Sequence, residues 1–326
     1  MNKGFPRRQF LVLGAAYGLA RGSPALAQAT YPDKPIKLVV PLPAGGSHDA
    51  AGRVFANALS AELKQPVIVE NKVGATGHVG GEFLARSAPD GYTLGFVASS
   101  SQAASPHMMK LNYKPMEDLI PVALVVTTDI VVIATKSLPV QNIPELIAYA
   151  KANPDKLSFG SYGGGGNQHL GGEMLCTMGG IQMVHVPYSS NQLLPDLISG
   201  RIQVFVTPLV GVEPMVQAGS LKIIGVASQA RLPQLPQVAT VAETIPGFAV
   251  NGWGMLMAPA GTPLAILQKL NAASNKALSN DQVKEALTKL RLTPATLTLA
   301  ETKDFMHSEW ARWGKVIRDA KIPMVN

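Results

Sequence analysis

Residues 36–53 read Ile-Lys-Leu-Val-Val-Pro-Leu-Pro-Ala-Gly-Gly-Ser-His-Asp-Ala-Ala-Gly-Arg, and they predict a strand, a loop and the start of a helix. The first five residues are mostly β-branched or apolar and have prolines on both sides, which is typical of a buried parallel strand. The next eight carry two prolines and two glycines. Asp49 follows at the expected position of a helix N-cap, ahead of an amphipathic run that ends at Leu63.

This order of elements predicts an anion site. The first N–H groups of a helix lack backbone partners, and the positive end of the helix dipole lies at the same point. Gly45 and Gly46 have no Cβ, so the backbone can turn sharply there and approach a ligand closely. An ordinary turn built from flexible residues remains the alternative for one such loop taken alone.

The segments that follow alternate between strand and helix, which predicts an α/β fold with parallel sheets and helices on both faces. Two apolar runs within 119–135 are separated only by Thr127-Thr128-Asp129, so we expect the chain to cross into a second domain there. A second glycine-rich loop, Ser161–Asn167, follows a predicted strand, and the apolar run 253–258 is expected to return to the first domain. Loops at the carboxyl ends of strands in two domains would hold an elongated anion between them.

The N-terminus has the pattern of an export signal. Basic residues precede an apolar segment at 10–20, and Ala25-Leu26-Ala27 is an A-x-A cleavage site. We therefore predict a signal peptide at residues 1–27, cleaved near Ala27, and a periplasmic location; Arg7-Arg8 resembles a twin-arginine signal, and Sec export stays open. The expected domains of the mature chain are residues 28–128 with 255–326, and residues 129–254.

Charge and cysteine content exclude some classes of protein. The formal net charge is +7, and removal of the four basic residues of the signal, Lys3, Arg7, Arg8 and Arg21, leaves +3. This charge is too small to indicate nucleic-acid binding. Cys176 is the only cysteine, so the chain forms no internal disulfide and its stability must come from packing.

Further motifs lie along the chain in a fixed order: Val69-Glu70-Asn71-Lys72, Ala88–Leu94, Ser161 with His169-Leu170, His185-Val186-Pro187-Tyr188 and Ala258–Pro263. Together with Pro41–Asp49, they resemble the Bug family, the TctC-like extracytoplasmic solute-binding proteins of tripartite tricarboxylate transporters. The resemblance covers the mature chain. It implies a two-domain Venus-flytrap fold, like that of type II periplasmic binding proteins, which binds a small carboxylate between its domains without catalysis and without a cofactor.

The resemblance also implies the residues of the ligand site. The first loop and Ser99 would form the near wall, the second loop and His169 the far wall, and Tyr188 and Thr207 would lie near the floor. The expected ligand-binding residues are Leu42, Pro43, Ala44, Gly45, Gly46, Ser47, His48, Asp49, Ser99, Ser161, Gly163, Gly164, Asn167, His169, Tyr188 and Thr207.

Three residues that bear on the ligand depart from the family pattern. Thr207-Pro208 stands where members commonly carry Asp-Asn, and Leu42 stands where an aromatic residue is frequent. Without that acid, a ligand ammonium group would lack a partner. The sequence therefore favours a dicarboxylate or an aromatic carboxylate over an amino acid.

The sequence gives less support to the enzyme classes that its motifs could suggest. Gly74-Ala75-Thr76-Gly77-His78-Val79-Gly80 looks like the fingerprint of an atypical nicotinamide-dependent reductase, but its strand is not the first of the sheet and no Tyr-x-x-x-Lys pair occurs. A Gly-x-Ser-x-Gly elbow is also missing, which argues against a serine hydrolase. The six histidines lack ligand spacing such as His-x-x-x-His, so we expect no metal site. His169 and His185 are expected to be supporting or core histidines rather than catalytic residues.

The expected partners are a small carboxylate and the membrane permease subunits of a tripartite tricarboxylate transporter, with the protein itself a monomer. A protein that senses the ligand and signals to a sensor kinase would use the same fold. The residues leave that alternative open.

Overall fold

The computed structural model describes residues 31–163, 165–188, 192–228, 230–319, 321–322 and 324, together with Met1. The predicted signal peptide therefore lies, except for Met1, outside the described residues. The strands are β1 (Ile36–Val40), β2 (Val67–Asn71), β3 (Thr93–Ala98), β4 (Leu119–Thr128), β5 (Ile130–Thr135), β6 (Ser158–Ser161), β7 (Val184–Pro187), β8 (Val204–Pro208), β9 (Leu221–Val226), β10 (Gly252–Pro259) and β11 (Leu292–Pro294). The helices are α1 (Ser47–Leu63), α2 (His78–Ala85), α3 (Ile143–Ala152), α4 (Asn167–Gly179), α5 (Leu193–Ser199), α6 (Glu213–Gln217), α7 (Leu264–Ser279), α8 (Asp281–Lys289) and α9 (Leu299–Asp319).

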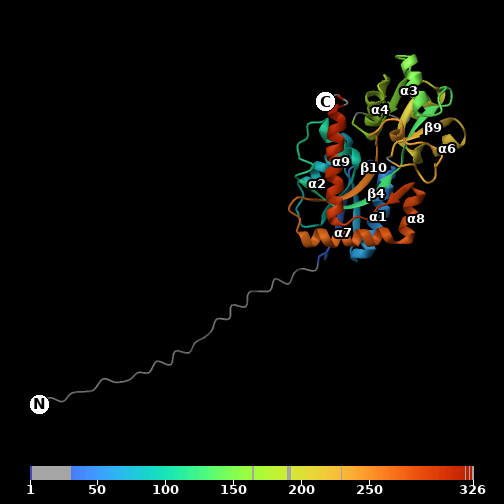
Figure 1. The fold of residues 1–326 in the computed structure, drawn as a ribbon. Helices are drawn as coiled ribbons and strands as arrows, with labels where there is room; N and C mark the ends of the chain where they lie inside the picture. The colour runs from blue at the N-terminus through green and yellow to red at the C-terminus, as the bar shows by residue number, and fades with distance from the viewer. Residues whose placement is uncertain are drawn as a thin grey trace.

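The strands form two sheets, one in each lobe (Figure 1). The first has the order β11-β4-β10-β3-β1-β2 and the second the order β7-β6-β8-β5-β9. Strand β1 is parallel to β2 and β3, whereas β10 is antiparallel to β3 and β4. The sheets are therefore mixed rather than parallel throughout. The reason is that β4 leaves the first lobe and β10 returns to it beside β4, so these neighbours must run in opposite directions.

The chain passes between the sheets at two adjacent places. Strand β4 ends at Thr128 and β5 begins at Ile130, with only Asp129 between them. On the return, β10 begins at Gly252, which pairs with Thr128. The two connections thus lie side by side at one end of β4 and β10, where the chain passes between the lobes.

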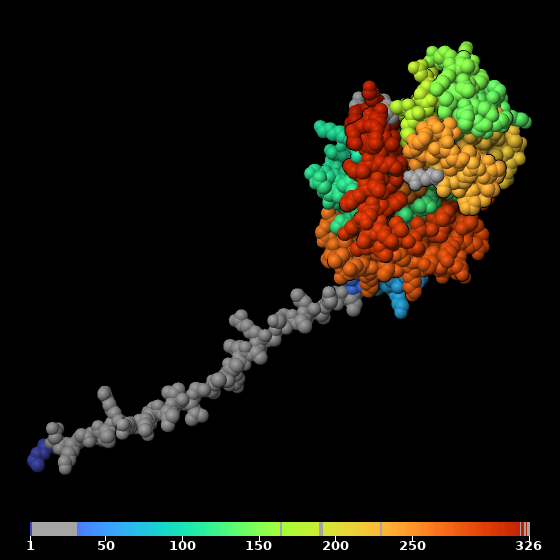
Figure 2. All heavy atoms as spheres, viewed as in Figure 1, coloured from blue at the N-terminus to red at the C-terminus, as the bar shows by residue number. Residues whose placement is uncertain are grey.

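Buried apolar side chains fill each lobe and continue between them. One cluster packs α1 and α7 against the first sheet, and another packs α5 against the second. A third includes residues of both sheets together with Trp313 of α9, which is fully buried. In the space-filling view, α9 (red) runs along the first lobe toward the second lobe (Figure 2).

Three local predictions differ from the structure. Gly46, not Asp49, is the N-cap of α1, so Asp49 is the third residue of the helix. The predicted hydroxyl-rich loop after β3 instead continues as a helical turn, Ser100–Ala104. The short strand β11 was not predicted within the C-terminal helical region. Among the described residues, no helix has the length and apolar character needed to span a membrane.

Candidate functional site

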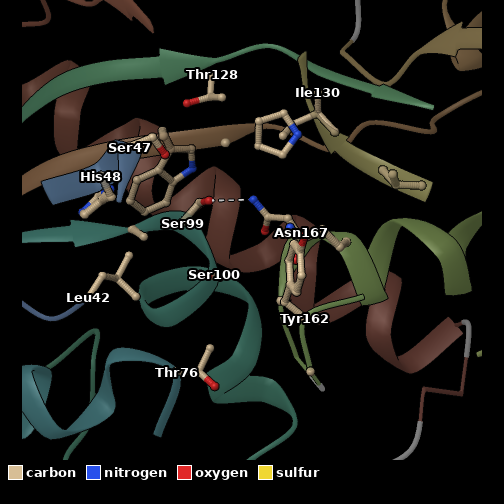
Figure 3. A pocket seen from close by; sticks show the side chains of 18 residues that line it. Leu42, Ser47, His48, Thr76, Ser99, Ser100, Thr128, Ile130, Tyr162 and Asn167 are labelled. Carbon is tan, nitrogen blue, oxygen red and sulfur yellow. Dashed lines mark hydrogen bonds between the residues drawn. The ribbon is translucent and has the colours of Figure 1, made fainter. Parts of the chain in front are cut away.

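A pocket of about 290 Å³ lies between the two lobes, next to both connections. Ser47 and His48 project from one side, and Asn167 and Tyr162 from the other (Figure 3). The described lining residues are Leu42, Ser47, His48, Thr76, Ala98, Ser99, Ser100, Thr128, Ile130, Tyr162, Gly163, Gly166, Asn167, Gln168, Val206, Pro208, Gly252 and Trp253. None of them is Asp, Glu, Lys or Arg. Binding of an ion here must therefore rely on dipoles and hydrogen bonds.

Two helices begin at this pocket, one from each lobe. Ser47 and His48 are the first residues of α1, and Asn167 and Gln168 are the first residues of α4. The first N–H groups of a helix carry partial positive charge and have no partner within the helix. The pocket therefore receives two positive helix ends from opposite sides, and this arrangement suits an anion.

Asp49 anchors the first loop from behind the pocket. Its buried carboxylate accepts hydrogen bonds from Gly45 N at 2.9 Å, Arg53 Nε at 2.9 Å and Asn71 Nδ2 at 2.8 Å. Burial alone would raise its pKa, but these hydrogen bonds and the Arg53 charge lower it to about 2. Asn71 Nδ2 also donates to Leu42 O, at 3.0 Å. The Asp49 charge is thus paired with Arg53 and serves to hold the loop.

His48 contributes a neutral ring to the near wall. The ring stacks on Phe96 with a centroid distance of 4.3 Å, and Nε2 lies 3.0 Å from Phe96 O. A carbonyl oxygen only accepts, so Nε2 carries the proton and Nδ1 keeps its lone pair. Burial lowers the pKa of His48 to about 4, although the bond to the Phe96 carbonyl opposes this shift. His48 therefore offers no positive charge at neutral pH.

One side-chain bond joins the walls across the pocket. Asn167 Nδ2 donates to Ser99 Oγ at 3.0 Å (Figure 3). It also lies 3.4 Å from Asn251 O. Asn167 Oδ1 is buried and has no hydrogen-bond partner among the residues that the structure describes. Since Ser99 Oγ accepts from Asn167, its own hydroxyl proton remains available for a ligand oxygen.

The second loop is held by two histidines behind it. His185 Nε2 lies 2.7 Å from Ser161 Oγ, which also contacts both Gly163 N and Gly163 O. Gly165 N donates to His169 Nδ1 at 3.2 Å. Burial, followed by the neighbouring His169, lowers the pKa of His185 to about 4. These hydrogen bonds hold the second loop in place as the far wall of the pocket.

The predicted site residues fall into three groups. Six of them line the pocket, namely Leu42, Ser47, His48, Ser99, Gly163 and Asn167. Nine other predicted residues do not line it, namely Pro43, Ala44, Gly45, Gly46, Asp49, Ser161, His169, Tyr188 and Thr207. Gly164 lies outside the described residues.

Physical reasons account for several residues outside the lining. Side chains alternate along a strand, so Val206 and Pro208 of β8 face the pocket and Thr207 between them does not. The Tyr188 hydroxyl donates to Asp196 Oδ2 at 2.9 Å, in the second lobe. The inference about ammonium ligands therefore cannot rest on Thr207. It rests on Pro208 and on the uncharged lining.

The expected site residues did not include the pocket-lining residues that lie next to the two connections between the lobes. Thr128 and Ile130 flank the first connection, while Gly252 and Trp253 follow the second, and all four line the pocket. The sequence predicts that the chain crosses between domains near these residues. Because a cleft between two domains is bordered by the segments that connect them, these four residues could have been predicted as lining residues. Tyr162 lies within the predicted second loop, Ser161–Asn167, although it was not among the expected ligand-binding residues, and Thr76 carried no comparable signal.

Two lobes joined by adjacent connections, with two helix N-termini opening on one pocket, define the class of two-domain periplasmic binding proteins. The family model described as "Tripartite tricarboxylate transporter family receptor" matches residues 51–322. The chain belongs to this TctC family. Its members are binding proteins and not enzymes, as was predicted.

Relatives and solved structures extend the similarity over the chain. Protein BugT of Bordetella pertussis is 34% identical over 316 residues, which cover 96% of this chain and 97% of BugT. The structure entitled "R. palustris Rpa4515 with adipate" has a TM-score of 0.78 and 30% identity, covering 90% of this chain and 99% of that one. MatC from Rhodopseudomonas palustris with bound malate has a TM-score of 0.76 and 30% identity, covering 88% and 100%. The predicted Bug family and two-domain fold are confirmed.

Proposed function

We propose that the mature protein captures a small carboxylate in this pocket and delivers it to the membrane permease subunits of a tripartite tricarboxylate-type transporter. The observation that carries the proposal is that α1 and α4, from opposite lobes, both begin at one pocket whose described lining has no charged side chain. Backbone N–H groups and helix dipoles at these ends stabilise an anion. The adipate and malate of the two similar structures are both dicarboxylates, which supports this ligand class.

The apolar side chains that line the pocket favour a ligand with an apolar body. Ile130, Val206, Pro208 and Trp253 present carbon-rich surfaces to the pocket. Covering such a surface contributes about 25 cal/mol per Å² of apolar area. We therefore propose a dicarboxylate or an aromatic carboxylate as the ligand. Its carboxylate would lie at the helix ends and its body against the floor.

The proposal includes export and closure of the two lobes. Residues 1–27 would direct export to the periplasm, and the domains would be residues 28–128 with 255–326, and residues 129–254. Rotation about the connections at Asp129 and before Gly252 would close the lobes on the ligand. Small-angle scattering of the mature chain should then give a smaller radius of gyration at ligand saturation.

Calorimetry on the mature chain tests the binding step. Adipate, malate and benzoate are titrated, with adipamide as an uncharged control of nearly the same shape as adipate. At 100 times its dissociation constant, a carboxylate should raise the free energy of unfolding by about 2.7 kcal/mol. Equal binding of adipamide and adipate, or conversion of a bound acid seen by mass spectrometry, would refute the proposal.

A further inference from the structure

The two loops of the pocket end in the same backbone geometry. Gly45 and Gly165 have φ angles of 81° and 80°, in the left-handed region that favours glycine. The N-cap residues that follow have nearly equal angles, φ −76° and ψ 164° at Gly46, and φ −78° and ψ 163° at Gly166. Residues 45–49 of the first loop therefore correspond to residues 165–169 of the second.

At the corresponding third position of each helix, a side chain accepts a hydrogen bond from the loop. Asp49 Oδ2 accepts from Gly45 N at 2.9 Å, and His169 Nδ1 accepts from Gly165 N at 3.2 Å. Each bond closes the turn that leads into the helix, so it fixes the direction of the N–H groups that follow. A histidine thus stands in the second loop where a carboxylate stands in the first.

This bond determines the tautomer of His169. Nδ1 can accept only without a proton, so the neutral ring carries its proton on Nε2. Nε2 lies 3.5 Å from Glu173 Oε1, one helical turn further along α4. The Glu173 carboxylate therefore favours the tautomer that the loop needs. His169 is itself buried, with 5% of its surface exposed.

The same cluster could be taken for a metal site, and its geometry argues against one. Among the described residues, His169, Glu173 and His185 offer ligand atoms within 4.8 Å of one another. The two imidazoles are stacked, with centroids 4.2 Å apart and planes 28° apart, so their in-plane lone pairs do not converge on one ion. His169 Nδ1 already accepts from Gly165, and His185 Nε2 lies 2.7 Å from Ser161 Oγ.

We propose that His169 is a positioning residue of the ligand pocket, in the role that Asp49 has in the first loop. Through Nδ1 it holds Gly165, so that Gly166, Asn167 and the start of α4 face the pocket. Because an imidazole nitrogen does this, the second loop has no carboxylate at the position that Asp49 occupies in the first, and the carboxylate of Glu173 lies one helical turn further along α4. The consequence of this anchoring for the ligand rests on the proposed carboxylate function, whereas the anchoring itself does not.

Two polar variants of similar size separate anchoring from general packing. In His169→Asn the side-chain oxygen can take the place of Nδ1, whereas in His169→Gln the amide corresponds to Nε2. Hydrogen exchange of the Gly165 amide in the ligand-free mature protein is measured first, by NMR. We expect exchange in H169N within about threefold of the wild type, and at least tenfold faster exchange in H169Q. Equal exchange in the three proteins would overturn the proposal.

Calorimetry with adipate, and a zinc titration, complete the test. Affinity for adipate should follow the exchange result, with H169N near the wild type and H169Q at least fivefold weaker. If the wild type binds neither adipate nor the other carboxylates, the proposed function fails, and the exchange measurement still decides the role of His169. A zinc-dependent rise in melting temperature that Glu173→Gln abolishes would mark a metal site and overturn the assignment.

Discussion

Asn167 of α4 donates a hydrogen bond from Nδ2 to Ser99 Oγ at the end of β3, 3.0 Å away on the opposite wall of the pocket. The same amide group lies 3.4 Å from Asn251 O, at the second connection between the lobes. This side chain of the second lobe therefore contacts both the first lobe and the second connection. The hydrogen bond to Ser99 forms only when the two walls are close together. It also fixes how the Ser99 hydroxyl faces a ligand.

Substitution of this pair should weaken ligand binding in a graded way. Ser99→Ala removes one neutral hydrogen bond and should cost about 0.5–1.5 kcal/mol of binding free energy. Asn167→Asp should cost more, because a negative charge then lies beside the ligand carboxylate and an oxygen faces Asn251 O. Calorimetry with adipate measures both. A smaller loss in N167D than in S99A would contradict this interpretation.

Local patterns predicted most of the helices and strands, but only six of the eighteen described residues that line the pocket, and physical causes explain the difference. The strand, loop and helix at 36–63 could be read from residues close in sequence, as could the crossing near Asp129. The roles of Asp49 and Thr207 could not, because they depend on which face of a helix or strand meets the pocket. The contact between His169 and Gly165 could not be predicted either, since a histidine in a helix carries no mark of its tautomer.

Two corresponding glycines offer a matched test of the second wall. Gly46 and Gly166 are both N-caps with negative φ, and an added Cβ would meet no atom closer than 3.5 Å at Gly46 or 3.7 Å at Gly166. A side chain at position 46 would therefore cause no backbone strain, because the positive φ of the first loop is at Gly45. Only Gly166 lines the pocket.

Both alanine variants should fold and lose similar stability, about 0.5–1 kcal/mol, because Ala is a poorer N-cap than Gly. Affinity for adipate should fall in Gly166→Ala, because Gly166 lines the pocket, and stay within about twofold of the wild type in Gly46→Ala, because Gly46 does not. Calorimetry and urea unfolding measure the two effects separately. An equal loss of affinity in both would show that the loops respond as one unit.

Stability should fall as the pH drops from about 6.5 toward 4. Burial lowers the pKa values of His48, His78 and His185 to about 4, so the unfolded chain binds protons in this range before the folded one does. Each histidine contributes stability that is present above the unfolded pKa and is lost as the pH falls, by up to about 1.4 kcal/mol per pH unit. Asp49, with a pKa of about 2, adds its own loss only below about pH 4.

Urea unfolding at pH 7, 5.5 and 4.5 tests this dependence. His78 is buried and contacts Tyr113 Oη and Ser105 Oγ, away from the pocket lining. His78→Gln should lower stability at pH 7 and reduce the loss between pH 7 and 4.5. His307→Gln is the control, because this side chain is exposed. If the free energy of unfolding of H78Q depends on pH as in the wild type, His78 does not contribute to the loss of stability at low pH.

A buried carboxylate ties α9 to the second connection. Glu309 Oε2 accepts from Trp253 Nε1 at 2.9 Å and from Arg312 Nη2 at 2.9 Å, and Arg312 Nη1 donates to Ala249 O. Glu309→Ala removes the acceptor of Trp253 Nε1 and Arg312 Nη2 and should lower the free energy of unfolding by about 3–5 kcal/mol. Breaking the exposed Lys315–Asp319 pair with Asp319→Ala should cost less than about 1 kcal/mol. Denaturant unfolding compares the two, and equal losses would mean that burial of Glu309 is unimportant.

Succinate should bind more tightly than aspartate, from which it differs only by the ammonium group. That group would lose its water without finding a partner, because no described lining residue is acidic, and burial of an unpaired charge is costly. Asp49 is already paired with Arg53, and Glu213 with Arg291 at 2.8 Å, so neither carboxylate is available to it. Calorimetry in one buffer measures both ligands, and Pro208→Asp, which adds an acid to the lining, should narrow or reverse the difference. Tighter binding of aspartate by the wild type would mean that one of these ion pairs opens toward the ligand.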